Sequence, residues 1–156
     1  MPNWCEGTLK VRGAISELKS FVFKGLLEVN STGRATEPLI FDEEDDFSFY
    51  IRNIKRPLWI IGTHRAFFDP DYIDVCADTK TEKVTMCLPF RQAWRIDAEE
   101  LLAVCKEYDV DMNIQGFERG LEFAQIITII DGKIVRNDEF KYDDWNWDCP
   151  CPEKGG

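Results

Sequence analysis

Cysteines are the most reactive side chains of this chain, which has 156 residues and six cysteines. Cys149 and Cys151 form the closest pair, with one residue between them. Tetrahedral zinc sites need four ligands and usually take paired cysteines separated by about two to four residues. Cys5 would be a third ligand, and His64 is the single histidine. We therefore predict free thiols, with no metal and no cofactor. The other cysteines are Cys76, Cys87 and Cys105, which lie in apolar segments where cysteine acts as a small hydrophobe.

Catalytic patterns are missing from the sequence. His64 has no motif that places a nucleophile or a second acid–base group beside it. Asp69, Asp71 and Asp74 lack the glycine and the closing glutamate of a calcium loop. Glycine-rich loops that cradle phosphates are also missing. We predict no catalytic residue and a protein that is not an enzyme, because function has to be argued from a site.

Carboxylates are concentrated in two segments. One is the acidic run 42–46, and the other is the segment 137–156, which interleaves acids with aromatic residues. Aromatic side chains set among carboxylates can anchor and steer a partner that has a basic surface. The predicted partner-binding residues are Asp42, Glu43, Glu44, Asp45, Asp46, Asp143, Asp144, Trp145 and Trp147. The alternative is a solvated acidic face with tail tryptophans folded back over the sheet, which we favour for Trp145.

Basic residues are few, and the formal net charge is −10. This charge opposes binding to phosphate backbones and to anionic membranes. A basic island in an acid-free stretch is expected to form ion pairs with the neighbouring acidic run; its members are Arg52, Lys55, Arg56 and Arg65. The segment 119–126 loosely matches an RNA-binding strand, but Leu121 and Ile126 occupy its stacking positions. We predict no direct nucleic-acid binding.

Local patterns predict two helices. Ser16 is the predicted cap of a helix whose apolar stripe contains Leu18, Phe21 and Val22. Residues 97–100 form a capping box, which predicts a helix over about 98–108.

Strands are predicted from alternating apolar and polar residues. Segments 73–77 and 84–88 flank a polar turn and predict one hairpin, and Asp131-Gly132 predicts another. Further strands are predicted at 8–12, 47–54 and 110–114, with a loop at 28–36.

This order of elements predicts a single α+β domain over residues 1–156, with an acidic aromatic C-terminal segment at 137–156. The predicted fold is a ferredoxin-like split βαβ arrangement, an antiparallel sheet with two helices on one face. Extra strands or the C-terminal extension would cover the other face. The opening residues are not a signal peptide, and the apolar stretches are too short to span a membrane. We therefore predict a cytoplasmic protein.

Three motifs resemble one protein family. They are Met1-Pro2-Asn3-Trp4-Cys5, Ala93-Trp94-Arg95, and the segment 116–124. Together they are similar to the YubB-type ferredoxin-like domains of small phage and plasmid proteins (Api-like). Ile96-Asp97 and Ala124 depart from the family pattern. The resemblance implies a mobile-element origin and a bacterial host cell, and we expect the motif tryptophans Trp4 and Trp94 to lie in the core.

The sequence therefore predicts a small, acidic, non-enzymatic phage or mobile-element protein that binds a host protein through its carboxylates. One version is mimicry of nucleic-acid charge, which would inhibit a host defence or DNA-processing factor with a basic groove. The alternative is a ferredoxin-like module that binds nucleic acid or a small ligand on its open sheet face.

Overall fold

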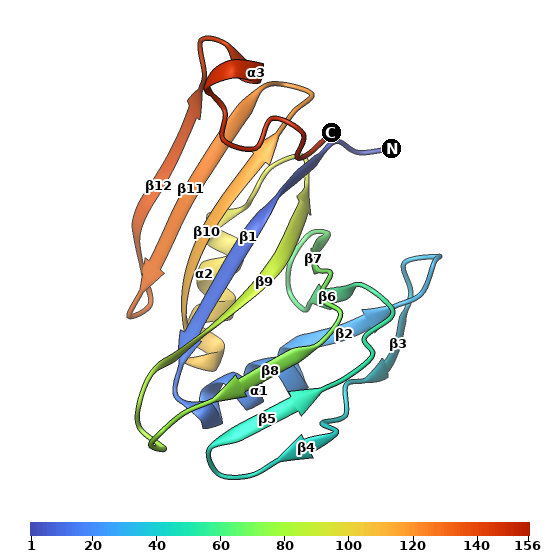
Figure 1. The fold of residues 1–156 in the computed structure, drawn as a ribbon, viewed down its shortest axis with the longest axis vertical. Helices are drawn as coiled ribbons and strands as arrows, with labels where there is room; N and C mark the ends of the chain where they lie inside the picture. Colours follow the sequence, from blue (N-terminus) through green and yellow to red (C-terminus); the bar gives the residue numbers. More distant parts are fainter.

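The computed structural model describes the backbone of residues 1–156 and every side chain except those of Ala35 and Glu37. Antiparallel sheet is the main regular structure of the chain (Figure 1). The strands are β1 (Trp4–Gly13), β2 (Leu26–Val29), β3 (Ala35–Pro38), β4 (Glu43–Glu44), β5 (Ser48–Ile51), β6 (Leu58–Ile60), β7 (Ala66–Phe68), β8 (Ile73–Cys76), β9 (Val84–Ala93), β10 (Asp111–Glu118), β11 (Phe123–Ile130) and β12 (Lys133–Lys141). The helices are α1 (Ile15–Gly25), α2 (Ala98–Tyr108) and α3 (Trp145–Asp148).

Nine strands form the main sheet, in the order β12-β11-β10-β1-β9-β7-β6-β2-β3, and β4-β5-β8 form a second sheet. The ferredoxin-like prediction is therefore wrong. That arrangement has two strands between its helices, whereas β2 to β9 all lie between α1 and α2 here. Residues 26–76 contain short alternating stretches that insert β6 and β7 into the main sheet and build the second sheet.

The predicted hairpin of 73–77 with 84–88 is also wrong. β8 pairs with β5 in the second sheet, and β9 pairs with β1 and β7 in the main sheet. Alternation predicted both strands correctly, but it carries no information about the partner. The register of β9 with β1 runs from Val84 to Ala93, so β9 pairs with β1 along its whole length. The Asp131-Gly132 hairpin is confirmed as the turn between β11 and β12.

Helices α1 and α2 lie on one face of the main sheet (Figure 1). The predicted cap of α1 is off by two residues, because the cap is Ala14, whose N–H donates to the Glu17 carboxylate at 2.8 Å. The helix at 98–108 is confirmed, and the Asp97 carboxylate accepts from the N–H groups of Glu99 and Glu100. The apolar faces of both helices and the second sheet share one buried core with the main sheet.

The C-terminal segment covers part of the opposite face, which we call the open face. Trp145 and Cys149 are buried against Phe117 and Ala124 of β10 and β11. The chain then returns to β1, where the Gly156 N–H donates to the Trp4 carbonyl at 3.0 Å. The predicted fold-back of Trp145 is therefore confirmed. The tail leaves the β9, β7 and β6 part of the open face uncovered, because its anchors lie on β10, β11 and the start of β1.

The family-like motifs meet at one end of the sheet. A Cβ at Gly120 would lie 2.4 Å from the Asn3 side-chain nitrogen, so the first and third motifs are in direct contact. The fully buried Glu118 accepts from the N–H groups of Gly120 and Leu121. Trp94 follows β9 with a φ of 70° and is 55% exposed, so the prediction that it lies in the core is wrong. These motifs shape the turns at this end of the molecule.

Candidate functional site

Aromatic and basic side chains stand in register across the uncovered part of the open face. Trp59 of β6 is opposite Phe67 of β7, and Phe67 is opposite Arg91 of β9. Their chain neighbours Leu58, Phe68 and Phe90 are buried in the core. Because side chains alternate between the two faces of a strand, Trp59, Phe67 and Arg91 all point to the open face, where each is half-buried.

Trp4 organises this surface. The Arg91 guanidinium lies 4.6 Å from the centre of the Trp4 ring, and the Arg65 guanidinium lies 5.3 Å from it. Phe67 meets the same ring edge-on, with ring centres 6.0 Å apart. Trp4 is half-buried, so its predicted place in the core is wrong. A guanidinium near an aromatic face is attracted by the ring quadrupole, and Trp4 therefore holds two cations together.

Arg91 also contacts a carboxylate. Its Nε lies 2.9 Å from Asp69 Oδ2, but this contact lacks hydrogen-bond geometry, and the buried Nε has no hydrogen-bond partner within the described side chains. Burial raises the pKa of Asp69 above its ordinary value, and Arg91 opposes that rise. The guanidinium has further N–H groups on its two Nη atoms. Because Nε is buried, these Nη groups are the ones that can meet an anionic ligand.

These residues line a hollow of about 940 Å³, here called the Trp4 hollow. Its cations are Lys55, Arg56, Arg65 and Arg91, and its other walls include Trp4, Phe67 and the turn at residues 30–33. Among the side chains that the structure describes, no ion pair involves Lys55, Arg56 or Arg65. Arg65 also adopts a φ of 55°, a conformation that non-glycine residues rarely take and that is often found at functional sites.

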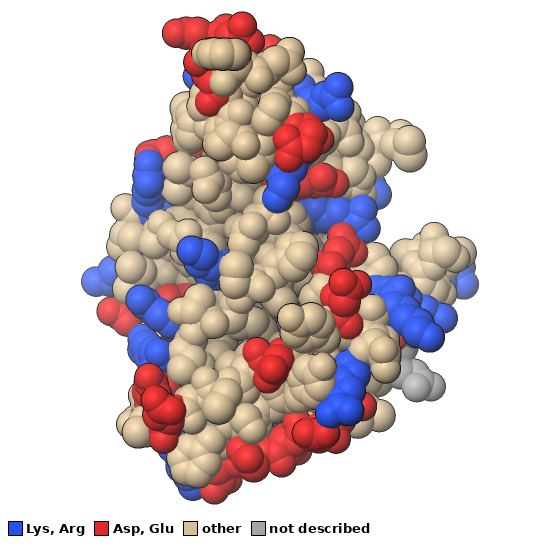
Figure 2. Space-filling model, viewed as in Figure 1, with Lys and Arg blue, Asp and Glu red and all other residues tan. Residues whose placement is uncertain are grey.

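The basic island was predicted to form ion pairs with the acidic run, and only one of its four members does so. Arg52 does pair with the acidic run, through Glu43 at 2.5 Å. Lys55, Arg56 and Arg65 instead line the Trp4 hollow. Figure 2 shows Lys and Arg side chains at the right edge of this face, beside the β2–β3 hairpin, with Asp and Glu side chains next to them and along the lower edge. Of the four island residues, only Arg52 forms an ion pair in the described contacts.

A second hollow of about 250 Å³ adjoins the first. The two share Val29, Gly33, Arg65 and Phe67 in their walls. The remaining walls of the second hollow are Trp59, Thr63 and His64. The Trp59 indole N–H donates to the Thr63 carbonyl at 3.1 Å, which holds the indole ring in place without a ligand.

The predicted acidic residues have partners within the chain. Asp42 accepts from the Arg52 N–H, and Asp45 accepts from the Phe47 N–H, which is the main reason that the pKa of Asp45 is lowered. The ion pairs of the run are Glu43 with Arg52, Glu44 with Lys19, and Asp46 with Lys80. The run therefore bonds to its own surroundings, although all of its members are solvent-exposed.

At the C-terminal end, the predicted residues separate into two kinds. Trp145 is 4% exposed, and its indole N–H donates to the Pro152 carbonyl at 3.0 Å. Trp147 is 85% exposed. Asp144 caps the short helix α3 by accepting from the Trp147 N–H, and Asp143 is exposed. Only Asp143 and Trp147 of this group are free of a structural role in the described contacts.

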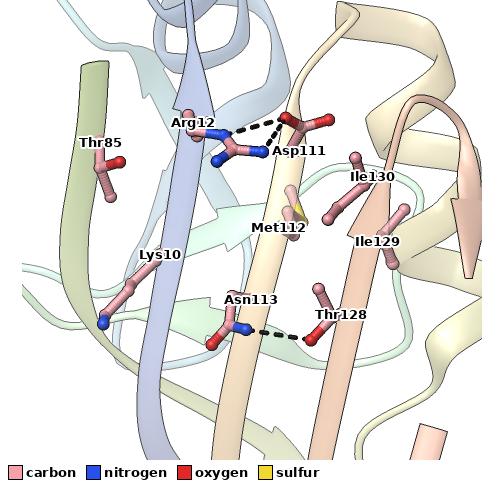
Figure 3. A pocket seen from close by; sticks show the side chains of 9 residues that line it. All are labelled: Lys10, Arg12, Thr85, Asp111, Met112, Asn113, Thr128, Ile129 and Ile130. Atoms are coloured by element: carbon pink, nitrogen blue, oxygen red, sulfur yellow. Dashed lines mark hydrogen bonds and ion pairs between the residues drawn. The ribbon is translucent and has the colours of Figure 1, made fainter. Parts of the chain in front are cut away.

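A further hollow on the open face lies over β1, β10 and β11 (Figure 3). Arg12 and Asp111 point toward each other there, with Arg12 Nη2 2.8 Å from Asp111 Oδ2, and Asn113 donates to Thr128 at 3.0 Å. Asp111 also accepts from the Asp131 N–H, which fixes the β11–β12 turn. These polar groups form hydrogen bonds with one another, so we assign this hollow a structural role.

Among the described residues, no three potential ligands come together as a metal site, and the metal-free prediction stays a prediction. Helices long and apolar enough to cross a membrane are also absent from the described residues. No protein-family model, curated protein or solved structure matches this chain.

Proposed function

We propose that this chain is a binding protein and that the Trp4 hollow takes a small ligand carrying several phosphate groups. The observation that supports this most is the convergence of Lys55, Arg56, Arg65 and Arg91 on one hollow, with two guanidiniums held against Trp4. Arginine binds phosphate oxygens through paired N–H groups, and lysine acts as a mobile point charge.

The net charge of −10 does not oppose a ligand of this size. Exposed charges are screened over about 8 Å at physiological ionic strength, so a small ligand responds to the cations around it. The acidic run lies on β4 and the β4–β5 turn at the lower edge of the molecule (Figure 1), and each of its ion pairs is internal. A volume of about 940 Å³ is within the range of ligand sites.

Isothermal titration with inorganic tripolyphosphate at physiological ionic strength tests this proposal. The double variant Lys55→Gln/Arg56→Gln should bind about tenfold more weakly, a loss of about 1.4 kcal/mol. The matched control is Lys133→Gln/Lys141→Gln, which removes the same charge from exposed positions on β12 and should bind as the parent does. Equal weakening in both variants would show that only net charge matters, and it would contradict the proposal.

A second candidate keeps the C-terminal part of the sequence prediction, a partner with a basic surface bound by the acidic C-terminal segment. The 85% exposure of Trp147, with Asp143 and Asp148 also exposed, favours it. Exposed aromatic residues within a polar rim are typical anchors of protein interfaces. Host-factor inhibition by charge mimicry is the specific form of this candidate.

A further inference from the structure

We infer that the ligand is a nucleotide, with its phosphates in the Trp4 hollow and its base against Trp59 and Phe67 in the adjoining hollow. This inference rests on the proposed function and adds the chemical class of the ligand. It depends on two features of the open face, which are the continuity of the two hollows and the aromatic pair Trp59 and Phe67 at one end of them.

The two hollows form one continuous surface because they share Val29, Gly33, Arg65 and Phe67. Arg65 and Phe67 belong to both, so a ligand whose phosphates contact Arg65 has its other end beside Trp59. A Cβ at Gly33 would meet no atom within 4 Å, so the shared wall borders open space at that point. A bipartite ligand fits this shape better than phosphate alone.

The end of the two hollows that contains Trp59 can stack against the planar base of a ligand. Trp59 and Phe67 are directly opposite each other on β6 and β7, and both are half-buried on the open face. Trp4, in contrast, already has Arg65 and Arg91 near its ring, and Arg91 also lies 5.7 Å from the centre of the Phe67 ring. Trp59 is therefore the main stacking surface, Phe67 lies beside it, and Trp4 serves the phosphate end. Stacking of a base on an aromatic side chain strengthens binding by about tenfold.

Two sources share this chemistry, a free nucleotide and a nucleotide unit of a single strand. Outside the two hollows, the cations Arg12, Lys83, Arg95 and Arg136 are paired with carboxylates, and the tail covers part of the open face. A long strand would extend past the cations, so we commit to the free nucleotide and use an oligonucleotide as a separate arm of the test.

The test compares the affinities of ATP, tripolyphosphate and an oligothymidine strand by isothermal titration at matched ionic strength. ATP should bind the parent about tenfold more tightly than tripolyphosphate. Trp59→Leu should remove that advantage while leaving tripolyphosphate binding unchanged, and Trp59→Phe should keep most of it. Trp94→Leu is the matched control, because Trp94 is exposed and outside both hollows.

Each outcome separates the two claims. If ATP and tripolyphosphate bind the parent equally, the nucleotide inference is wrong and the proposed function stands. If neither binds, both are wrong. Tighter binding of the oligonucleotide than of ATP would overturn the free nucleotide as the source. If Trp59→Leu melts at a lower temperature than the parent, the comparison with Trp59→Phe and the unchanged tripolyphosphate affinity still decide the inference.

Discussion

Asp111 is the residue whose charge contributes most clearly to the fold. Its side chain is 7% exposed, and it accepts hydrogen bonds from Arg12 and from the Asp131 N–H. Burial acts to raise its pKa, but these hydrogen bonds and the nearby Lys83 outweigh burial and lower the pKa below its ordinary value. A group with a lowered pKa stabilises the folded state above its unfolded pKa, and that contribution is lost as the pH falls through the folded pKa.

Asp111→Asn should therefore lower the free energy of unfolding at neutral pH by about 1.5–3 kcal/mol, the range for hydrogen bonds to charged groups. Urea unfolding measures the change. The difference between parent and variant should shrink as the pH falls below about 4, because the carboxylate is protonated first in the unfolded chain and only at its lowered pKa in the folded protein. Asp138→Asn, which removes an exposed pair with Arg136, is the control and should have little effect. A difference independent of pH would contradict this assignment.

The cysteines should differ in reactivity. Burial is the main cause that raises the pKa of the Cys5 thiol to about 12 and that of the Cys105 thiol to about 12. Cys76 and Cys87 are exposed. Because the thiolate is the reactive form, Cys76 and Cys87 should react rapidly with a thiol reagent near pH 8, and Cys5 and Cys105 only after unfolding. The Cys76→Ser/Cys87→Ser variant should lose most of the rapid phase, with the half-buried Cys151 as the remaining accessible thiol; if the rapid phase persists in full, the burial assignments are wrong.

At the scale of elements, short-range sequence signals predicted a helix cap and a hairpin turn correctly. The Asp97 cap and the Asp131-Gly132 turn each lie within a few residues of the structure they specify, and both predictions are confirmed. The partner of β8 and the nine-stranded sheet depend on contacts between distant segments. Alternation marks a strand but not its neighbour, so the sheet order could not be predicted.

The C-terminal segment should stabilise the sheet through Trp145. Its ring is buried with Phe117 and Ala124, so Trp145→Ala should lower the free energy of unfolding by about 3–5 kcal/mol. Trp147→Ala removes the same side chain from an 85% exposed position and should change stability by less than about 0.5 kcal/mol. Thermal unfolding of the two variants gives the comparison. Equal stability of the two variants would mean that the C-terminal segment does not stabilise the sheet.

At the scale of the whole molecule, the sequence identified part of the candidate site but misjudged its role. Lys55, Arg56 and Arg65 were predicted as ion-pair partners because charge patterns along a chain favour neighbours. Arg91 was missed, because it meets Trp4 and Arg65 only when β1, β7 and β9 come together. A cationic hollow built from distant segments has no signature in residue spacing.

The acidic segment makes its own prediction at this scale. If Trp147 and Asp143 contact a basic host protein, the parent should capture it from bacterial lysate at low salt, and capture should fall as salt rises. Trp147→Ala should speed dissociation. Asp143→Asn/Asp144→Asn should slow association, since asparagine can still cap α3. Lys133→Gln is the control. Capture unchanged by all three variants would contradict this candidate.

The most direct test of the central claim, phosphate binding in the Trp4 hollow, follows the indole N–H signals of the five tryptophans by nuclear magnetic resonance. Tripolyphosphate should shift the Trp4 signal most, because Arg65 and Arg91 lie against its ring. Trp145 and Trp147, at the far side of the open face, should not move. Saturable shifts confined to Trp4 and its neighbours are the predicted result. Shifts at Trp147 with none at Trp4, or no shifts at all, would contradict the account.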